Sequence, residues 1–212
     1  MAQQPLDITP QNGGKFPWGK PNTDVSQFED EFSLRKVAVS GIFDHTKEFH
    51  VAKVRNGEKG FDIVTPFFTH LNEKGEECGI MVNRGWVPED LLGQKVHYMG
   101  ATSGKIIGLL YRGDAKNKYS TPNDPMVDQY HRVDPYDMSL VSQLRNLDEA
   151  SKFMVLQIDE DPDARQVHPS IPTADELVAW KISPERHEAY AKLWRYLTFA
   201  GVFANTALWL YF

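Results

Sequence analysis

The sequence predicts an α+β fold, in which a mainly antiparallel, barrel-like β domain with one short helix precedes a single C-terminal transmembrane helix. Three observations predict it. Apolar and polar residues alternate in several segments of 34–182, as in half-buried strands. The last 17 residues, Tyr196–Phe212, contain no charge. Proline and glycine recur before residue 34, so we expect an extended arm over 1–33, a soluble β-rich domain over 34–182 and a transmembrane helix over 183–212.

The N-terminal arm is predicted from its proline and glycine residues, which interrupt helices and strands. Its aromatic residues are candidate anchors: Phe16, Trp18, Phe28 and Phe32. Of these, we expect Trp18 to contact a partner protein. The arm has no apolar segment typical of a secretory signal, and it is too acidic for a typical mitochondrial presequence. The alternative to an anchored arm is a disordered leader.

Seven strands and one helix are predicted in the soluble domain. The strands are Val37–Phe43, Phe49–Val54, Phe61–Phe67, Glu77–Val87, Lys105–Arg112, Phe153–Asp159 and Glu176–Ile182. Pro66 has no backbone N–H, which restricts its position in the third strand to a sheet edge or a bulge. The turn residues Asn72–Gly75 predict a hairpin between the third and fourth strands. Apolar residues at helical spacing predict the helix over Tyr136–Leu147, after a long polar loop.

The C-terminal helix is predicted from its start signals and its length. Ser183 suits an N-cap, and Pro184 suits the first helical position. The uncharged stretch Tyr196–Phe212 is roughly 25 Å long at ~1.5 Å per residue, close to the ~30 Å of a hydrocarbon core. We therefore expect the helix to cross a lipid bilayer once. The alternative is a buried core helix of a soluble domain.

One face of this helix carries small or polar residues at spacings of three and four, namely Thr198, Gly201 and Asn205. In a bilayer such residues mark the approach of another helix, because they permit close packing and hydrogen bonds between helices. We expect this stripe to contact a partner protein. In the alternative, the Asn205 amide bonds to the backbone of its own helix.

Composition excludes several classes of function. The net charge is −6 and the pI is about 5.6, so the chain lacks the basic surface that nucleic-acid binding requires. The one cysteine, Cys78, excludes a disulfide framework, a zinc ribbon and CxxC redox chemistry, and it argues against a copper carrier. The sequence contains no motif of a catalytic nucleophile with its base and no Gly-rich nucleotide loop. We therefore expect a binding protein and not an enzyme.

Two polar motifs of the soluble domain are candidate sites. After the first strand, Asp44, Glu48 and His50 would share one face of an extended segment, which suggests a metal site. The alternative is a turn in which Asp44 accepts nearby backbone N–H groups. In the fourth strand, we expect Arg84 to pair with a carboxylate of this domain or of a partner.

A third motif lies at the start of the C-terminal helix, where His187, Tyr190 and Trp194 share one face. A neutral imidazole nitrogen can ligate haem iron, and aromatic rings can stack on the macrocycle. These residues are therefore candidate haem ligands and contacts. The alternative is a histidine that forms a hydrogen bond to the soluble domain.

Six motifs in order resemble those of the surfeit locus protein 1 family over about residues 35–212. They are Gly41-x-Phe43-Asp44-His45-x-x-Glu48, Val64-Thr65-Pro66-Phe67, Val82-Asn83-Arg84-Gly85-Trp86-Val87-Pro88, Pro122-Asn123-x-Pro125, Asp134-x-x-x-Met138 and His187-x-x-Tyr190-x-x-x-Trp194. The chain resembles a divergent member, because residues 1–33 stand where the family has an N-terminal membrane helix. Tyr130, Glu185 and Arg195 also depart from the family's pattern.

The resemblance implies a protein of the mitochondrial inner membrane that binds cytochrome c oxidase, complex IV of the respiratory chain. Its soluble domain would lie in the intermembrane space, and its partners would be oxidase subunits and the lipid bilayer. It would act in oxidase assembly or remain bound as an accessory subunit. One alternative is a chaperone that binds haem a, with His187 as the ligand that the family suggests. Another is an unrelated tail-anchored binding domain.

Overall fold

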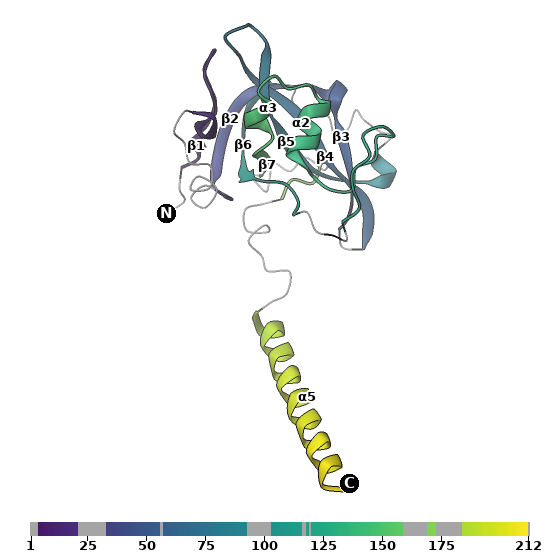
Figure 1. Cartoon of the computed structure of the whole chain (residues 1–212). Coiled ribbons are helices and arrows are strands. Elements are labelled where there is room, and N and C mark those ends of the chain that lie inside the picture. Colours follow the sequence, from purple (N-terminus) through teal and green to yellow (C-terminus); the bar gives the residue numbers. More distant parts are fainter. Residues whose placement is uncertain are drawn as a thin grey trace. The chain divides into compact units, whose positions relative to one another are not determined.

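The structure is a computed structural model that describes residues 4–20, 33–55, 57–92, 103–115, 118, 120–158, 169–172 and 184–211, with side chains in the last range from 188 onward. The chain divides into two compact units, Met1–Ala174 and Asp175–Phe212. The first unit contains a β-rich domain, and the second contains one long helix (Figure 1). The predicted arm lies in the first unit.

In the described parts of the chain, seven strands form one sheet. They are β1 (Leu6–Asp7), β2 (Lys36–Phe43), β3 (Phe49–Arg55), β4 (Glu58–Leu71), β5 (Glu77–Pro88), β6 (Ser103–Tyr111) and β7 (Met154–Gln157). The strand order is β1-β2-β6-β7-β5-β4-β3, with a further pairing between β2 and β4. This pairing closes β2, β6, β7, β5 and β4 into a barrel, which confirms the predicted architecture. The β1–β2 and β5–β7 pairs are parallel, and the others are antiparallel.

The predicted strands correspond to β2 through β7, except that the segment Glu176–Ile182 lies outside the described residues. The additional strand β1 lies within the predicted arm. The predicted hairpin joins β4 and β5, where Asn72 Oδ1 accepts the N–H groups of Lys74 and Glu76. Pro66 lies between the part of β4 that pairs with β3 and the part that pairs with β2, so it stands where the strand changes its neighbour.

Two hydrophobic clusters cover opposite faces of the sheet. The interior cluster includes Val37, Val39, Phe43, Phe67, Ile80, Val82, Ile106, Leu110, Phe153 and Val155. The outer cluster includes Phe49, Val51, Val64, Met81, Tyr130, Val133, Met138, Leu144, Ala150 and Met154. Because neighbouring residues of a strand face opposite sides, β5 supplies both clusters and is buried from Cys78 to Pro88.

Two short helices, α2 (Pro135–Val141) and α3 (Leu147–Ala150), pack beside β5 and cover one face of the sheet (Figure 1). They replace the single helix predicted over Tyr136–Leu147. Gln143 has φ 60°, the left-handed conformation that ends a helix, and the Arg145 N–H donates to Glu77 O of β5 at 3.4 Å. The Asn146 amide then bonds both backbone groups of Gly79 in β5, at 3.0 and 2.9 Å.

The arm packs on the barrel. β1 pairs with β2, and the short 3₁₀ helix η1 (Pro17–Gly19) follows it. Phe16 and Trp18 are fully buried, stack with ring centroids 4.9 Å apart and belong to the interior cluster. The expectation that Trp18 contacts a partner is therefore corrected, because its indole is enclosed by its own domain. Phe28 and Phe32 lie outside the described residues.

The second unit contains α5 (Pro184–Tyr211), so the predicted C-terminal helix is present. The structure does not support the prediction that it spans a membrane. Among the described residues, no helix is both long enough and apolar enough to cross a membrane. With 28 residues α5 has the length, but its first half is charged and Thr198, Asn205 and Thr206 lower the apolarity of its second half.

Candidate functional site

Two of the sequence motifs meet at the end of the barrel where β2 stops. β2 ends at Phe43, the 3₁₀ helix η2 (His45–Lys47) follows, and Glu48 precedes β3. Arg84 reaches this turn from β5, with its Nη1 3.2 Å from His45 Nδ1 and 3.4 Å from Glu48 Oε2. The predicted pairing of Arg84 with a carboxylate is confirmed within this domain. A contact of Arg84 with another protein stays a prediction.

Glu48 is the centre of this group of side chains. Its Oε1 lies 3.1 Å from His50 Nε2, and Thr65 Oγ1 donates to its Oε2 at 3.4 Å. The side chains of Arg84 and Glu48 are 5% and 8% exposed, so the pair is shielded from water. The guanidinium also lies over the Phe43 ring, 4.9 Å from its centroid. We name the polar residues the barrel-end cluster: His45, Glu48, His50 and Arg84.

The contact with Arg84 defines the tautomer of His45. A guanidinium has no acceptor, so it donates to Nδ1, and the neutral ring carries its proton on Nε2. Nε2 is buried and has no hydrogen-bond partner among the described residues. Burial, together with the Arg84 charge, holds the pKa of His45 below its ordinary value, although the carboxylates of Glu48 and Asp44 oppose this.

We expect the folded domain to lose stability through His45 as the pH falls from about 7.5 to about 5.5. The folded-state pKa lies below the unfolded value of about 6.5, so the unfolded chain binds the proton first. The free energy of unfolding is therefore highest above this unfolded-state pKa and decreases as the pH falls below it. Urea unfolding at both pH values should show a smaller loss for His45→Gln than for wild type, whereas the exposed His131→Gln should keep the wild-type loss. An unchanged pH dependence in His45→Gln would contradict this assignment.

The glycine that follows Arg84 allows a close backbone approach. Gly85 has φ +116°, which other residues rarely adopt. The segment 169–172 meets the strand here, because Trp86 N–H donates to Ser170 O at 3.2 Å and Ser170 N–H donates to Trp86 O at 2.7 Å. A Cβ atom on Gly85 would lie only 2.7 Å from Ser170 O. Three consecutive residues thus make two kinds of contact: Arg84 pairs with Glu48, and Trp86 bonds to the backbone of Ser170.

We expect Gly85→Ala to lower the free energy of unfolding by about 2–3 kcal/mol, through backbone strain and the clash with Ser170. Gly75 is the matched control, since it has φ +76° but nothing within 4 Å of an added Cβ. Gly75→Ala should cost about 1 kcal/mol, from the backbone alone. Urea unfolding measures both losses. Equal losses would show that the Ser170 contact does not restrict position 85.

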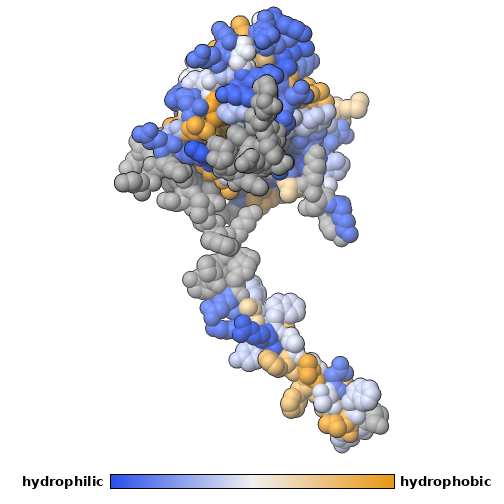
Figure 2. All heavy atoms as spheres, turned by 60° about the vertical axis from the view of Figure 1, so that its left-hand side comes forward, coloured by the Kyte–Doolittle hydropathy of each residue, from blue (hydrophilic) through white to orange (hydrophobic). Residues whose placement is uncertain are grey.

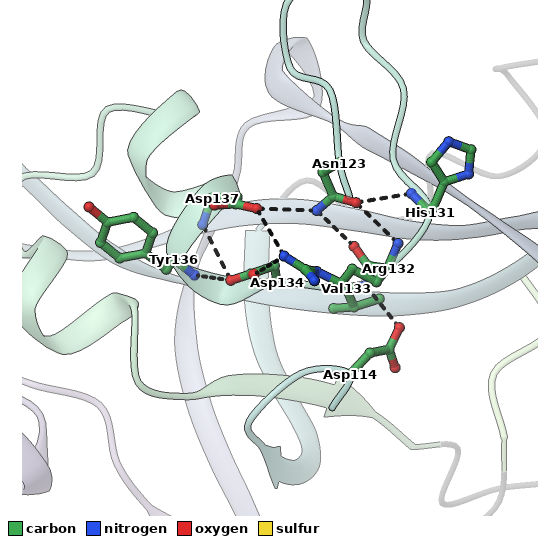
Figure 3. Close-up of polar contacts among 8 residues, drawn as sticks. All are labelled: Asp114, Asn123, His131, Arg132, Val133, Asp134, Tyr136 and Asp137. Atoms are coloured by element: carbon green, nitrogen blue, oxygen red, sulfur yellow. Dashed lines mark hydrogen bonds and ion pairs between the residues drawn. The ribbon is translucent and has the colours of Figure 1, made fainter. Parts of the chain in front are cut away.

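A second polar group holds the long loop between β6 and α2 (Figure 3). Asn123 Oδ1 accepts the N–H groups of His131 and Arg132 at 3.0 and 3.2 Å, and Asn123 Nδ2 donates to Arg132 O at 3.1 Å. The same Nδ2 lies 3.4 Å from Asp137 Oδ2 in α2. One amide side chain therefore connects two parts of the loop and the following helix.

Arg132 and Asp114 connect this loop to the helix and the sheet. Arg132 Nη2 lies 3.2 Å from Oδ2 of Asp134, and Asp134 is the N-cap residue of α2. Asp114 Oδ2 accepts from Val133 N–H at 2.9 Å and from Lys53 Nζ at 2.6 Å. Burial alone would raise the pKa of Asp114, but these donors and the Tyr111 hydroxyl outweigh it and hold the pKa below its ordinary value. We name these residues the loop network: Asp114, Asn123, Arg132, Asp134 and Asp137.

The metal site expected at Asp44, Glu48 and His50 is not assembled. Asp44 Oδ1 instead accepts the Thr46 N–H at 3.0 Å and caps η2, as in the alternative interpretation. No group of three His, Cys, Asp or Glu side chains in the described parts of the chain could hold a metal ion. The prediction of a turn at this position is therefore confirmed.

The residues predicted to bind haem lie on α5. Tyr190 and Trp194 are exposed, and the side chain of His187 lies outside the described residues. A haem site encloses most of the macrocycle between protein walls, whereas two exposed rings on one helix offer a single open side. The described residues therefore do not form a haem site on their own.

The residues predicted to bind a partner also lie on the exposed surface of α5. Thr198 Oγ1 donates to Trp194 O at 2.8 Å, so this hydroxyl is satisfied within the helix. At Gly201, no described atom outside the helix backbone lies within 4 Å of an added Cβ. Asn205 is exposed one turn further along. The stripe therefore has room for another chain, and its contact with a partner stays a prediction.

Sequence reasoning missed the carboxylate that holds the arm. Glu149 Oε2 accepts the Phe16 N–H at 2.9 Å, and its carbonyl oxygen accepts the Trp18 indole N–H at 3.0 Å. Burial raises the pKa of Glu149. Burial also raises the pKa of the Cys78 thiol, which makes it a poor nucleophile at neutral pH. The two Glu149 contacts thus fix the arm on the barrel.

Comparison with known proteins gives a consistent assignment. The chain matches the SURF1 family over residues 2–199. It is 27% identical to Surfeit locus protein 1 of Xenopus tropicalis over 144 residues, which are 58% of this chain and 45% of that protein. It is 28% identical to Surfeit locus protein 1 of Homo sapiens over 126 residues, which are 51% and 41% of the two chains.

A yeast relative is also similar over a shorter stretch. The chain is 36% identical to Cytochrome oxidase assembly protein SHY1 of Saccharomyces cerevisiae over 71 residues, which are 33% of this chain and 17% of that protein. The matched stretches thus span less than half the length of each of these three relatives. The family match is far longer and includes the barrel-end cluster and the loop network. The chain therefore belongs to the SURF1 family.

Proposed function

We propose that this protein acts in the assembly of cytochrome oxidase, by binding oxidase subunits and not by catalysing a reaction. The observation that carries the proposal is the family match over residues 2–199. A relative from Saccharomyces cerevisiae is named a cytochrome oxidase assembly protein, which supports the same role here. The motifs that the chain shares with the SURF1 family support a mitochondrial location, at the inner membrane and on its intermembrane-space side.

The helix α5 supplies a surface for this binding. Large apolar side chains are exposed along it, including Leu193, Phe199, Val202 and Phe203 (Figure 2). Exposed apolar surface of this extent marks interaction sites in proteins. We propose that an oxidase subunit packs along the stripe of Thr198, Gly201 and Asn205, where the side chains are small enough for close approach.

A native gel of mild-detergent extracts tests the proposed function. The tagged full-length chain should migrate with oxidase subunits. Recovery with partly assembled oxidase supports an assembly factor, whereas equimolar recovery with active oxidase supports a resident accessory subunit. A chain that never migrates with oxidase subunits would overturn the proposal.

Gly201→Leu should reduce the oxidase recovered with the chain about tenfold, because a leucine side chain fills the space that the partner would occupy. Ala207→Leu is the control, since position 207 lies on the opposite face of α5. It should leave recovery unchanged. Quantitative mass spectrometry of the recovered subunits measures both effects, and equal recovery from the two variants would place the contact elsewhere.

A further inference from the structure

The long loop between β6 and α2 presents an apolar turn to solvent. Met126 is 96% exposed and Val127 is 59% exposed, and Pro125 beside them is exposed as well. Burial of a methionine or valine side chain is favourable, because it removes apolar surface from water. A partner that covers the turn would therefore be stabilised by burial of both side chains.

The backbone of this turn is closed by its own hydrogen bonds. Asp124 N–H donates to Gln129 O at 2.8 Å, and Gln129 N–H donates to Asp124 O at 3.0 Å. Asp124 Oδ1 accepts the Met126 N–H at 3.1 Å. Asp128 has φ 55°, the left-handed conformation that completes the turn. The two apolar side chains are thus presented by a defined conformation.

The loop network anchors the base of the turn to the barrel (Figure 3). Asn123, just before the turn, bonds to His131 and Arg132, just after it. Between them Tyr130 is buried, and its carbonyl oxygen accepts the Ala52 N–H of β3 at 2.9 Å. A partner would therefore meet an element that is already ordered, and binding would lose little conformational entropy.

We propose that the turn Pro125–Asp128 is a contact element that inserts Met126 and Val127 into an apolar pocket of a partner protein. Two carboxylates, Asp124 and Asp128, flank this pair, and the turn contains no cation. Charge complementarity therefore calls for lysine or arginine side chains at the rim of the pocket. The same carboxylates are repelled by anionic lipid headgroups, which favours a protein over a membrane surface. The inference rests on the proposed function for the identity of the partner, an oxidase subunit.

Two identical substitutions test this inference. Val127 and Val54 are 59% and 66% exposed in the same domain, so Val127→Asp and Val54→Asp make one change at the turn and one away from it. Oxidase subunits are quantified after purification of each tagged full-length variant. Val127→Asp and Met126→Asp should lower recovery about tenfold, and Met126→Leu and Val54→Asp should keep it within about twofold of wild type.

The outcomes separate this inference from the proposed function. Equal recovery by Val127→Asp and Val54→Asp would overturn the contact, while a wild-type chain that recovers no oxidase subunit would overturn the proposed function. A photoreactive residue at position 126 identifies the class of partner. A cross-link to an oxidase subunit supports the inference, and a cross-link to lipid alone overturns it. Thermal unfolding of each variant provides the control for folding, since the side chains face water.

Discussion

Arg84→Ala should lower the free energy of unfolding of the β domain by about 3–5 kcal/mol. The substitution leaves the Glu48 carboxylate buried without its cation and removes the guanidinium from the Phe43 ring. A charge that stays in a poorly solvated place after losing its partner is far more costly than an exposed one. For a domain of this size, the melting temperature should fall by roughly 10 °C.

Urea and thermal unfolding of the full chain measure this loss, with Lys105→Ala as the matched control. Lys105 and Asp7 form an ion pair at 2.9 Å, but both side chains are 53% exposed, so Lys105→Ala should cost less than about 1 kcal/mol. The double variant Arg84→Met/Glu48→Gln removes both charges and should recover part of the loss. A loss for Arg84→Ala as small as that for Lys105→Ala would contradict the role assigned to the pair.

The strands could be predicted because their signal is local. Val37 and Val39 face the barrel interior, and Lys36 and Ser40 are less buried, so two-residue alternation identifies β2. The hairpin turn is also local, because the Asn72 side chain bonds to backbone groups two and four residues later. Such patterns depend on a residue and its near neighbours, which the sequence displays directly.

Barrel closure and the partner of Arg84 depend on contacts that are distant in sequence. Phe43 of β2 pairs with Phe67 of β4, and Arg84 meets a carboxylate 36 residues earlier. A buried arginine in a strand predicts that a carboxylate is needed, but the chain has 29 acidic residues from which sequence alone cannot choose. The acceptor role of His45 was missed for the same reason.

Composition alone did not decide the outcome at either end of the chain. Phe16 and Trp18 anchor the N-terminal arm as expected, but they do so in the core of their own barrel, where Trp18 is closed to a partner. At the other end, the absence of charge from Tyr196 to Phe212 predicts a membrane span. The uncharged polar residues Thr198, Asn205 and Thr206 nevertheless lower the hydropathy of this stretch. At both ends, a few individual side chains determine how the segment behaves, and the average composition of the segment does not show this.

Trp18→Ala should lower the free energy of unfolding by about 3–5 kcal/mol and release the arm from the barrel. The indole is buried, stacks on Phe16 and lies 5.0 Å from the Phe153 ring, centroid to centroid. Its N–H donates to the carbonyl oxygen of Glu149 at 3.0 Å. Truncation leaves a cavity in the interior cluster and removes the contacts that fix the arm.

Trypsin reports release of the arm separately from global unfolding, because its cleavage site after Lys15 adjoins the buried Phe16. Trp18→Ala should speed cleavage there about tenfold or more, since a peptide bond must open locally before it is cut. Trp18→Phe keeps a ring but loses the indole bond, so its loss should be intermediate. Tyr136→Ala removes a half-exposed ring from the same domain and should cost less than about 1 kcal/mol. If Trp18→Ala behaved like Tyr136→Ala in both measurements, the arm would lie on the barrel without completing its core, and the stability of the closed sheet would have to come from the strands alone.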